Sequence, residues 1–249
     1  MSKRFLNIAP TNAGTGVFSF SGAGNPQIIF NIANTGLLQA HELRFQGTFK
    51  IVDNTTGALL VPTADVNVDA FTGVQSAIQT LNIASRNYSN RSLEEILQYG
   101  RLVSSVQSTL HDKADFDCTL SHEAGSKGMG FDTVAELNAN GNTGQEYSAV
   151  GQRLASRIPY CAVGGKPFSM RLVCGTLMSM PMINLNDLGG ATITITLAPT
   201  SNVLWGANAS GYNYQIINPR LVVPILLETP EEQIQSAQNP TADMQFLSF

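Results

Sequence analysis

Alternating apolar and polar positions predict β-strands over most of the chain. The clearest alternation runs through 42–52, where Leu43, Phe45, Phe49 and Ile51 are separated by polar side chains. Because successive side chains of a strand point to opposite faces, this segment is expected to bury one face and expose the other. Further strands are predicted over 17–20, 27–32, 58–68 with a break at Pro62, 114–120, 168–174, 192–197, 212–217 and 221–227.

Two segments in the middle of the chain have a helical period instead. In 72–84, apolar residues recur at spacings of three and four, which predicts one apolar stripe on a helix. The same spacing runs through 92–107, where Ser92 and Glu95 match the pattern in which two side chains cap the first N–H groups of a helix. Gly100 falls on the packed side of this second helix, where a neighbouring element can approach closely.

The order of these elements predicts an all-β fold. Strands that do not alternate regularly with helices argue against a parallel βαβ sheet and favour a sandwich, and about eight strands is the number of a jelly roll. We therefore predict a jelly-roll β-sandwich domain over 1–230, with two short inserted helices. The Gly- and Asn-rich segment 121–165 is expected to be a long interaction loop. The polar segment 231–249 is expected to be a linker or C-terminal arm, or else to begin a second jelly roll.

The composition indicates a polar surface with few charges. Hydrophobic residues make up 43% of the 249 residues, enough to form a core, whereas charged residues make up only 13%, about half the usual share. The 20 Asn and 14 Gln outnumber the charged side chains. Amides cost less to bury against a partner than charges do, so this surface suits contact with other copies of the chain.

Charge and targeting signals argue against several classes of function. The formal net charge is −4 and the 14 basic residues are scattered along the sequence, whereas binding to nucleic-acid phosphates requires clustered Lys and Arg. We therefore expect no direct binding to nucleic acid. No apolar run approaches the roughly 20 residues that cross a bilayer, and the first ten residues lack the apolar stretch of a signal peptide. Three widely spaced cysteines indicate a reducing compartment rather than a disulfide framework.

Candidate residues for catalysis or metal binding are few. Cys118, His122, Cys161 and Cys174 are residue types that bind zinc, but they lack the two short-spaced pairs of a structural zinc site. A Cys–His nucleophile from the same residues is disfavoured because Cys118 and Cys174 fall on the apolar sides of their strands, where a thiol is buried and inert. The sequence therefore predicts no catalytic, cofactor-binding or metal-binding residue.

Two other functions remain as alternatives to a structural role. A jelly-roll hydrolase would place the carboxyl groups of Glu42 and Asp117 across a groove, although solvated strand residues explain both. A non-catalytic carbohydrate-binding sandwich would expose aromatic side chains, and Trp205, Tyr212 and Tyr214 cluster near the C-terminal end. The two tyrosines share one strand face, so packing in the core is the competing interpretation for them.

Two stretches of the sequence carry a family resemblance. One is LNIASR at 81–86, leading into SLEEILQYGR at 92–101; the other is FSMRLVCG at 168–175, followed by MINL and by LGGATITITLAP at 188–199. Together they resemble the N-terminal jelly roll of the double-jelly-roll major capsid proteins. These proteins build icosahedral shells in tailless phages, virophages, Polinton-like viruses and related large DNA viruses. The resemblance extends over roughly residues 80–230 and includes no catalytic residue.

The resemblance implies a structural major capsid protein of the virion, made in the host cytoplasm. It also implies homotrimers with a pseudo-hexagonal outline, because each subunit of that family contributes two upright jelly rolls. Long loops such as 121–165 would form towers or clasp neighbouring subunits. Terminal arms would face minor capsid or penton proteins, or an internal membrane.

The length departs from this family, because two jelly rolls need more than 249 residues if the first takes up 1–230. Three interpretations follow: the chain is a fragment, it is a subunit with a single roll, or two compact rolls share it. The leading hypothesis is a self-assembling structural protein of a virion shell. The alternative is the carbohydrate-binding sandwich.

Overall fold

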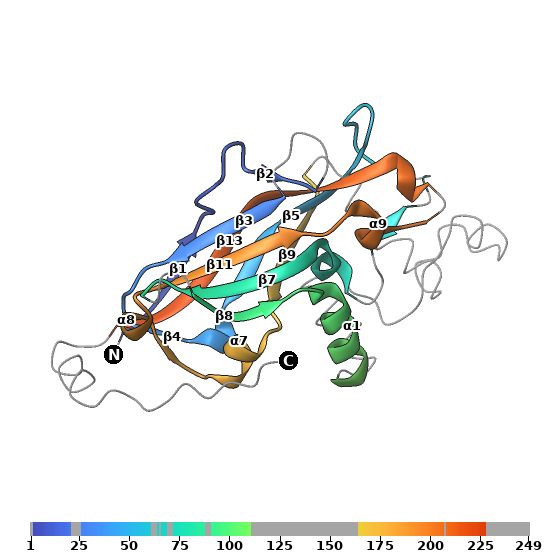
Figure 1. Cartoon of the computed structure of the whole chain (residues 1–249). Helices are drawn as coiled ribbons and strands as arrows, with labels where there is room; N and C mark the ends of the chain where they lie inside the picture. The colour runs from blue at the N-terminus through green and yellow to red at the C-terminus, as the bar shows by residue number, and fades with distance from the viewer. Residues whose placement is uncertain are drawn as a thin grey trace.

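Two antiparallel β-sheets face each other across a hydrophobic core in a computed structural model of the chain (Figure 1). Strand predominates and the helices are short, as a jelly-roll β-sandwich requires. The all-β, jelly-roll prediction is therefore confirmed. The structure describes residues 2–20, 26–60, 64, 66–68, 72–87, 91–110, 164–206 and 208–227.

The larger sheet is organised around its longest strand, β13 (Tyr212–Leu227). One edge of β13 pairs with β5 and then with β4, and the other edge pairs with β2 and then with β1. Strands β9 and β10 extend the sheet beyond β5 and β4. The remaining members of this sheet are β1 (Ser2–Ile8), β2 (Val17–Phe18), β4 (Leu37–Leu38), β5 (Arg44–Asp53), β9 (Lys166–Arg171) and β10 (Ile183–Asn184).

The smaller sheet has four strands in the order β3-β11-β7-β8. Its central strand β11 alternates buried and half-buried side chains along its whole length, as expected for a strand with one face toward the core. A separate two-stranded ribbon pairs β12 with β6. The bounds are β3 (Gln27–Ile32), β11 (Ala191–Leu197), β7 (Ile78–Ser85), β8 (Arg91–Ile96), β12 (Leu204–Trp205) and β6 (Asn67–Val68).

Helical segments lie at the ends of the strands and are short, apart from α1 (Tyr99–Leu110). Gly100 in α1 lies against Ser76, since a Cβ atom added to the glycine would be 3.6 Å from the Ser76 Cα atom. The prediction that Gly100 faces a closely packed neighbour is therefore confirmed. The other helical segments are η1 (Ala40–Glu42), η2 (Gly73–Ala77), α7 (Gly175–Ser179), α8 (Leu185–Leu188), α9 (Thr200–Val203) and η4 (Ala209–Gly211).

Phenylalanine side chains join the two sheets in the centre of the core. Phe45 of β5 is fully buried. Its ring packs edge-on against Phe30 of β3 at a centroid distance of 6.0 Å, and against Phe168 of β9 at 5.3 Å. Phe45 therefore contacts both layers of the sandwich, through rings arranged as aromatic pairs prefer.

The first predicted helix is wrong apart from the short segment η2, and the second is correct only from Tyr99 onward. Residues 78–84 of the segment predicted as the first helix belong to β7, which ends at Ser85, and residues 92–96 of the second belong to β8, which begins at Arg91. The two strands pair as an antiparallel hairpin, and the second helix begins only at Tyr99. Ser92 does not cap a helix; its hydroxyl oxygen instead accepts a hydrogen bond from the Asn82 side chain on the neighbouring strand. Cross-strand pairing has overridden the helical spacing of the apolar residues.

Other strand predictions agree with the structure to different degrees. The strands predicted over 27–32, 42–52 and 192–197 are confirmed within two residues at each end. Residues 212–217 and 221–227 are one continuous strand with a bulge, at which Asn218 has a φ of 47°. The pattern does not predict β1. The predicted strand 114–120, most of the loop 121–165 and the arm 231–249 lie outside the described residues.

Replacing Phe45 with alanine tests the aromatic contact between the sheets. We expect Phe45→Ala to lower the free energy of unfolding by about 3–5 kcal/mol, because it leaves a cavity between both layers. Urea denaturation followed by circular dichroism measures this change. Phe20→Ala is the control, because Phe20 is 43% exposed and its removal should cost less than about 1 kcal/mol. Equal effects of the two substitutions would contradict this account of the core.

Candidate functional site

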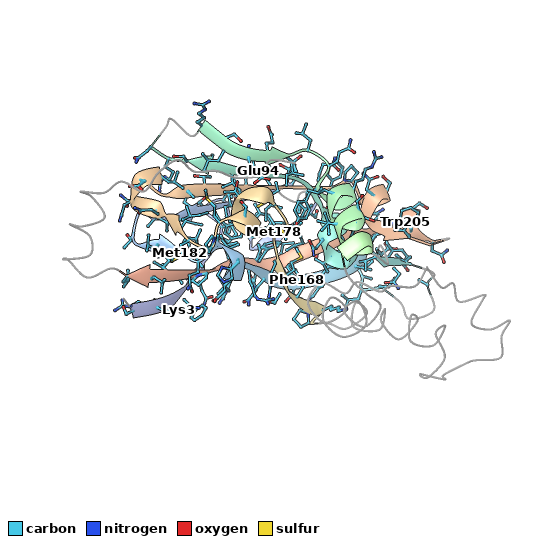
Figure 2. All side chains as sticks on the ribbon, turned by 90° about the horizontal axis from the view of Figure 1, so that it is seen from below. Lys3, Glu94, Phe168, Met178, Met182 and Trp205 are labelled. Atoms are coloured by element: carbon cyan, nitrogen blue, oxygen red, sulfur yellow. The ribbon has the colours of Figure 1, made fainter. Side chains whose placement is uncertain are left out.

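A buried glutamate connects the smaller sheet to helix α7. Glu94 of β8 is only 5% exposed (Figure 2). Its Oε1 atom accepts a hydrogen bond from the Gly175 N–H at 2.8 Å, and its Oε2 atom accepts one from the Thr176 N–H at 2.6 Å. These are the first two N–H groups of α7, which have no partner within the helix. The carboxylate therefore stabilises the helix start by charge-assisted hydrogen bonds.

A buried tyrosine holds the chain just before this helix. The Tyr99 hydroxyl donates a hydrogen bond to Gln75 Oε1 at 3.0 Å and accepts one from the Val173 N–H at 2.8 Å. Burial raises the pKa of Tyr99 far above its usual value. Together, Glu94 and Tyr99 hold the backbone N–H groups of Val173, Gly175 and Thr176, and we call this arrangement the buried polar link. The link has a structural role, because the polar groups of both side chains form hydrogen bonds with other groups of the chain.

Cys174 lies within the buried polar link. The side chain is fully buried. Burial, together with a smaller contribution from the charge of Glu94, raises the pKa of the Cys174 thiol to about 12. A thiol with such a pKa is protonated at neutral pH and is a poor nucleophile and a poor metal ligand. Cys118, His122 and Cys161, its predicted partners in a zinc site or Cys–His pair, lie outside the described residues.

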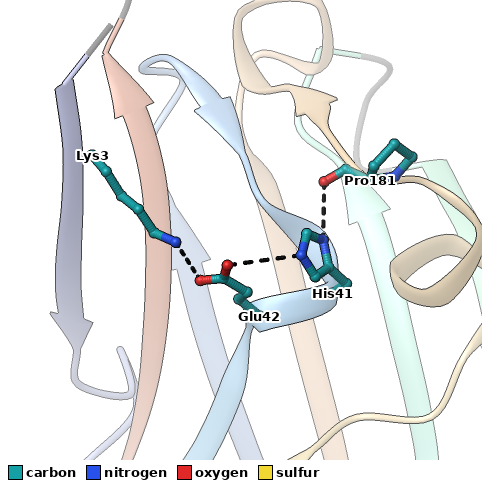
Figure 3. A network of polar contacts seen from close by, with 4 residues as sticks. All are labelled: Lys3, His41, Glu42 and Pro181. Atoms are coloured by element: carbon teal, nitrogen blue, oxygen red, sulfur yellow. Dashed lines mark hydrogen bonds and ion pairs between the residues drawn. The ribbon is translucent and has the colours of Figure 1, made fainter.

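Glu42, the predicted hydrolase carboxylate, forms an ion pair on the surface. Its Oε2 atom accepts a hydrogen bond from Lys3 Nζ at 2.5 Å, and its Oε1 atom lies 3.8 Å from His41 Nε2 (Figure 3). The Lys3 hydrogen bond is the main cause that lowers the pKa of Glu42. A carboxyl group held ionised in this way suits a surface contact rather than a proton donor. Asp117, its proposed catalytic partner, lies outside the described residues.

The aromatic cluster predicted for carbohydrate binding is not assembled on the surface. Tyr214 is fully buried, and its ring stacks on Phe49 at a centroid distance of 5.5 Å. Its hydroxyl group donates a hydrogen bond to the Ala198 carbonyl oxygen. Tyr212 packs against the core, and only Trp205 is exposed. The competing interpretation of core packing is therefore correct for Tyr214. This finding removes the sequence basis for the carbohydrate-binding alternative.

Trp205 borders a polar groove between η2, α1 and α9. The groove has a volume of about 510 Å³, and its lining includes Gln79, Gln98, Arg101 and Asn202. Arg101 donates a hydrogen bond to the Gln98 side chain at 2.9 Å. Among the described residues, no group of three His, Cys, Asp or Glu side chains is placed to hold a metal ion in this groove or elsewhere.

Several large apolar side chains are exposed on the surface. Met178 of α7 is 57% exposed and Met182 is 50% exposed (Figure 2), whereas Met170 is fully buried in the core. Phe5 and Leu6 of β1 are also exposed. Exposed methionine and phenylalanine are typical of surfaces that contact a partner. None of the helices in the described part of the chain is long and apolar enough to cross a membrane.

Comparison with known proteins identifies the fold but not a close relative. No protein-family model matches the sequence, and no curated protein matches it. Among solved structures, a chain from the Sputnik virophage matches with a TM-score of 0.51 and 10% identity, covering 92% of this chain and 48% of its own. The Faustovirus major capsid protein matches with a TM-score of 0.50 and 11% identity, covering 96% of this chain and 56% of its own. The mavirus major capsid protein matches with a TM-score of 0.44 and 12% identity, covering 92% of this chain and 47% of its own.

This chain has the fold of a viral major capsid protein. It spans about half the length of the viral chains that it matches. The described strands of this capsid-type fold make one sandwich with one core. The described strands therefore do not form two compact rolls.

Replacing Glu94 with glutamine tests the buried polar link. We expect Glu94→Gln to lower the free energy of unfolding by about 1–3 kcal/mol, because an amide accepts only one of the two backbone hydrogen bonds and has no charge. Chemical denaturation measures the change. Glu95→Gln is the matched control, since Glu95 is its exposed neighbour on the same strand, and it should change stability by less than about 0.5 kcal/mol. Similar values for both variants would show that the link does not stabilise the fold.

Alkylation tests the environment of Cys174. In a variant with Cys118→Ser and Cys161→Ser, Cys174 is the remaining cysteine. We expect iodoacetamide at pH 8 to leave it unmodified in the folded protein and to modify it after denaturation, because the thiol is buried and protonated. Mass spectrometry of the intact protein measures the reaction. Rapid modification of the folded variant would contradict the burial and raised pKa.

Proposed function

We propose that the chain is a structural subunit of an icosahedral virion shell and has no catalytic activity. The observation that carries the proposal is the sandwich itself, which aligns over more than nine-tenths of this chain with the Sputnik virophage chain and the Faustovirus major capsid protein. The first of these comes from the structure of a whole virophage, and the second is named as a major capsid protein. Both therefore support a place in the virion.

The distribution of polar groups also supports a role in assembly. The buried acid Glu94 and the buried hydroxyl of Tyr99 bind the chain's own backbone. The surface is rich in amides and carries exposed apolar side chains such as Met178, Met182 and Phe5. Such a surface can be buried between subunits at low desolvation cost.

The finer form of the proposal is a homotrimeric capsomer that contacts further capsomers, minor capsid or penton proteins and an internal membrane. Closed symmetric homo-oligomers are the usual product of a self-complementary surface. The chain spans about half the length of the viral chains that it matches, and its described strands form one sandwich. We further propose synthesis in the host cytoplasm and no direct contact with the genome.

Light scattering after size exclusion, with negative-stain images of the same fraction, tests self-assembly. The chain has a mass of 26.6 kDa, and we expect a species of three times this mass with hexagonal outlines, or larger shells. Pentamers or hexamers would retain the capsid role and replace the trimer with assemblies of single sandwiches. A monomer at millimolar concentration would contradict the proposed function.

A further inference from the structure

The polar groove beside Trp205 has a lining that the shell role does not use. The groove lies between η2, α1 and α9, and its volume of about 510 Å³ is in the range of pockets that hold small ligands. Figure 2 shows Trp205 at the end of the sandwich opposite Lys3, beside α1. Segments far apart in the sequence form the walls, since Gln79 is in β7, Arg101 in α1 and Asn202 in α9.

The indole ring of Trp205 borders the groove and is exposed to solvent. Trp205 is 51% exposed, whereas Leu204 before it in β12 is buried, so the two side chains point to opposite sides of the strand. A single exposed apolar side chain needs no explanation by itself. Here, however, the flat apolar ring lies at the edge of a concave polar surface. A ligand can therefore stack one face on the ring while its edges meet polar groups.

The polar lining of the groove includes three amide side chains, those of Gln79, Gln98 and Asn202. An amide carries a donor and an acceptor in one plane. Gln79 Nε2 donates a hydrogen bond to the Leu97 carbonyl oxygen at 3.4 Å. Gln98 Oε1 accepts one from Arg101 at 2.9 Å. Within the described part of the chain, these contacts leave Gln79 Oε1 and Gln98 Nε2 available to a ligand.

Among the described residues that line the groove, Arg101 is the only one with a charge. Its Nη1 atom donates the hydrogen bond to Gln98, which orients the guanidinium. The remaining N–H groups can form a planar pair of hydrogen bonds with a carboxylate. The same described lining contains no carboxylate or histidine that could act as a general acid or base. The arrangement therefore suits binding of an anionic ligand rather than its hydrolysis.

We propose that this groove binds an acidic saccharide, a sugar ring that carries a carboxylate. The C–H face of the ring stacks on the Trp205 indole, and the hydroxyl groups form hydrogen bonds with the three amide side chains. The carboxylate pairs with Arg101. A stacked nucleobase is the competing ligand for an exposed indole, but nucleic-acid strands need several cations along their path. The described lining supplies one.

This inference goes beyond the shell role and does not depend on it, because a single copy of the chain supplies the described lining. It also differs from the carbohydrate-binding alternative of the sequence, which relied on Tyr212 and Tyr214 together with Trp205. Neither tyrosine is among the described lining residues. The amides and the arginine that replace them come from β7, α1 and α9 and from the turn before α1.

Fluorescence of the full chain tests the proposal, because Trp205 is the only tryptophan. Its emission therefore reports on the groove without a label. We expect titration with sialyllactose to shift the emission to shorter wavelength and to protect the indole from quenching by acrylamide, because a stacked sugar ring excludes water. Lactose is the same glycan without the acidic sugar. It should bind at least about tenfold more weakly, since it lacks the carboxylate.

Two substitutions assign the binding to the groove, with affinity measured by isothermal titration calorimetry and folding verified by circular dichroism. We expect Arg101→Gln to weaken sialyllactose binding about tenfold and to leave lactose binding unchanged, because only the charge-assisted bonds are lost. Trp205→Ala should weaken binding of both glycans about tenfold or more, and Trp205→Phe should restore part of it. The matched controls are Arg91→Gln and Phe5→Ala, at exposed positions outside the described lining; both should bind like the wild type.

Each contrary result overturns the inference. No binding of sialyllactose at millimolar concentrations, or binding that leaves the Trp205 emission unchanged, excludes the groove as a site for an acidic saccharide. Equal affinity for lactose would replace the acidic saccharide with a neutral one. Tighter binding of single-stranded oligothymidine, lost in both groove variants, would replace it with nucleic acid. Because light scattering measures assembly separately, each of these results leaves the shell role standing.

Discussion

The larger sheet depends on backbone pairing along both edges of β13. This strand pairs with β5 and β4 on one side and with β2 and β1 on the other. Its side chains alternate between the core, where Tyr214 and Ile216 are fully buried, and the outer face. Because four other strands pair with β13 directly, a slip of one residue in its register would exchange its buried and exposed faces. The bulge at Asn218 leaves one face of β13 toward the core, because the Arg220 side chain again lies on the outer side.

The contact between the smaller sheet and α7 depends on groups that are costly to bury alone. A carboxylate such as that of Glu94 is stable in the interior only with hydrogen-bond donors directed at it. The first N–H groups of α7 have the converse requirement, since they need an acceptor outside the helix. Each partner satisfies the other, and Tyr99 holds the preceding residue Val173. The sandwich is thereby closed at this end by directional bonds as well as by apolar packing.

The fold class could be predicted from the sequence because it follows from local periodicity. Strands β3, β5 and β11 each have one apolar face, so a period of two identifies them from the sequence alone. Strand β8 could not be recognised in this way, because its buried position 94 is a glutamate and its apolar residues are spaced as in a helix. Strand β1 has exposed side chains on both faces, so no alternation marks it; its pairing with β13 defines it.

The candidate surfaces also divide into features that the local sequence predicts and features that strand pairing defines. Residue type and local order were enough to predict an apolar core, an amide-rich exterior, strands with one solvated face, and the resemblance to capsid proteins. They did not determine that Arg44, Arg171 and Arg220 share a face, or that Tyr214 is in the core and Trp205 is not. These placements depend on the tertiary structure, because strand pairing brings together residues whose separation in the sequence carries no information about their distance in space.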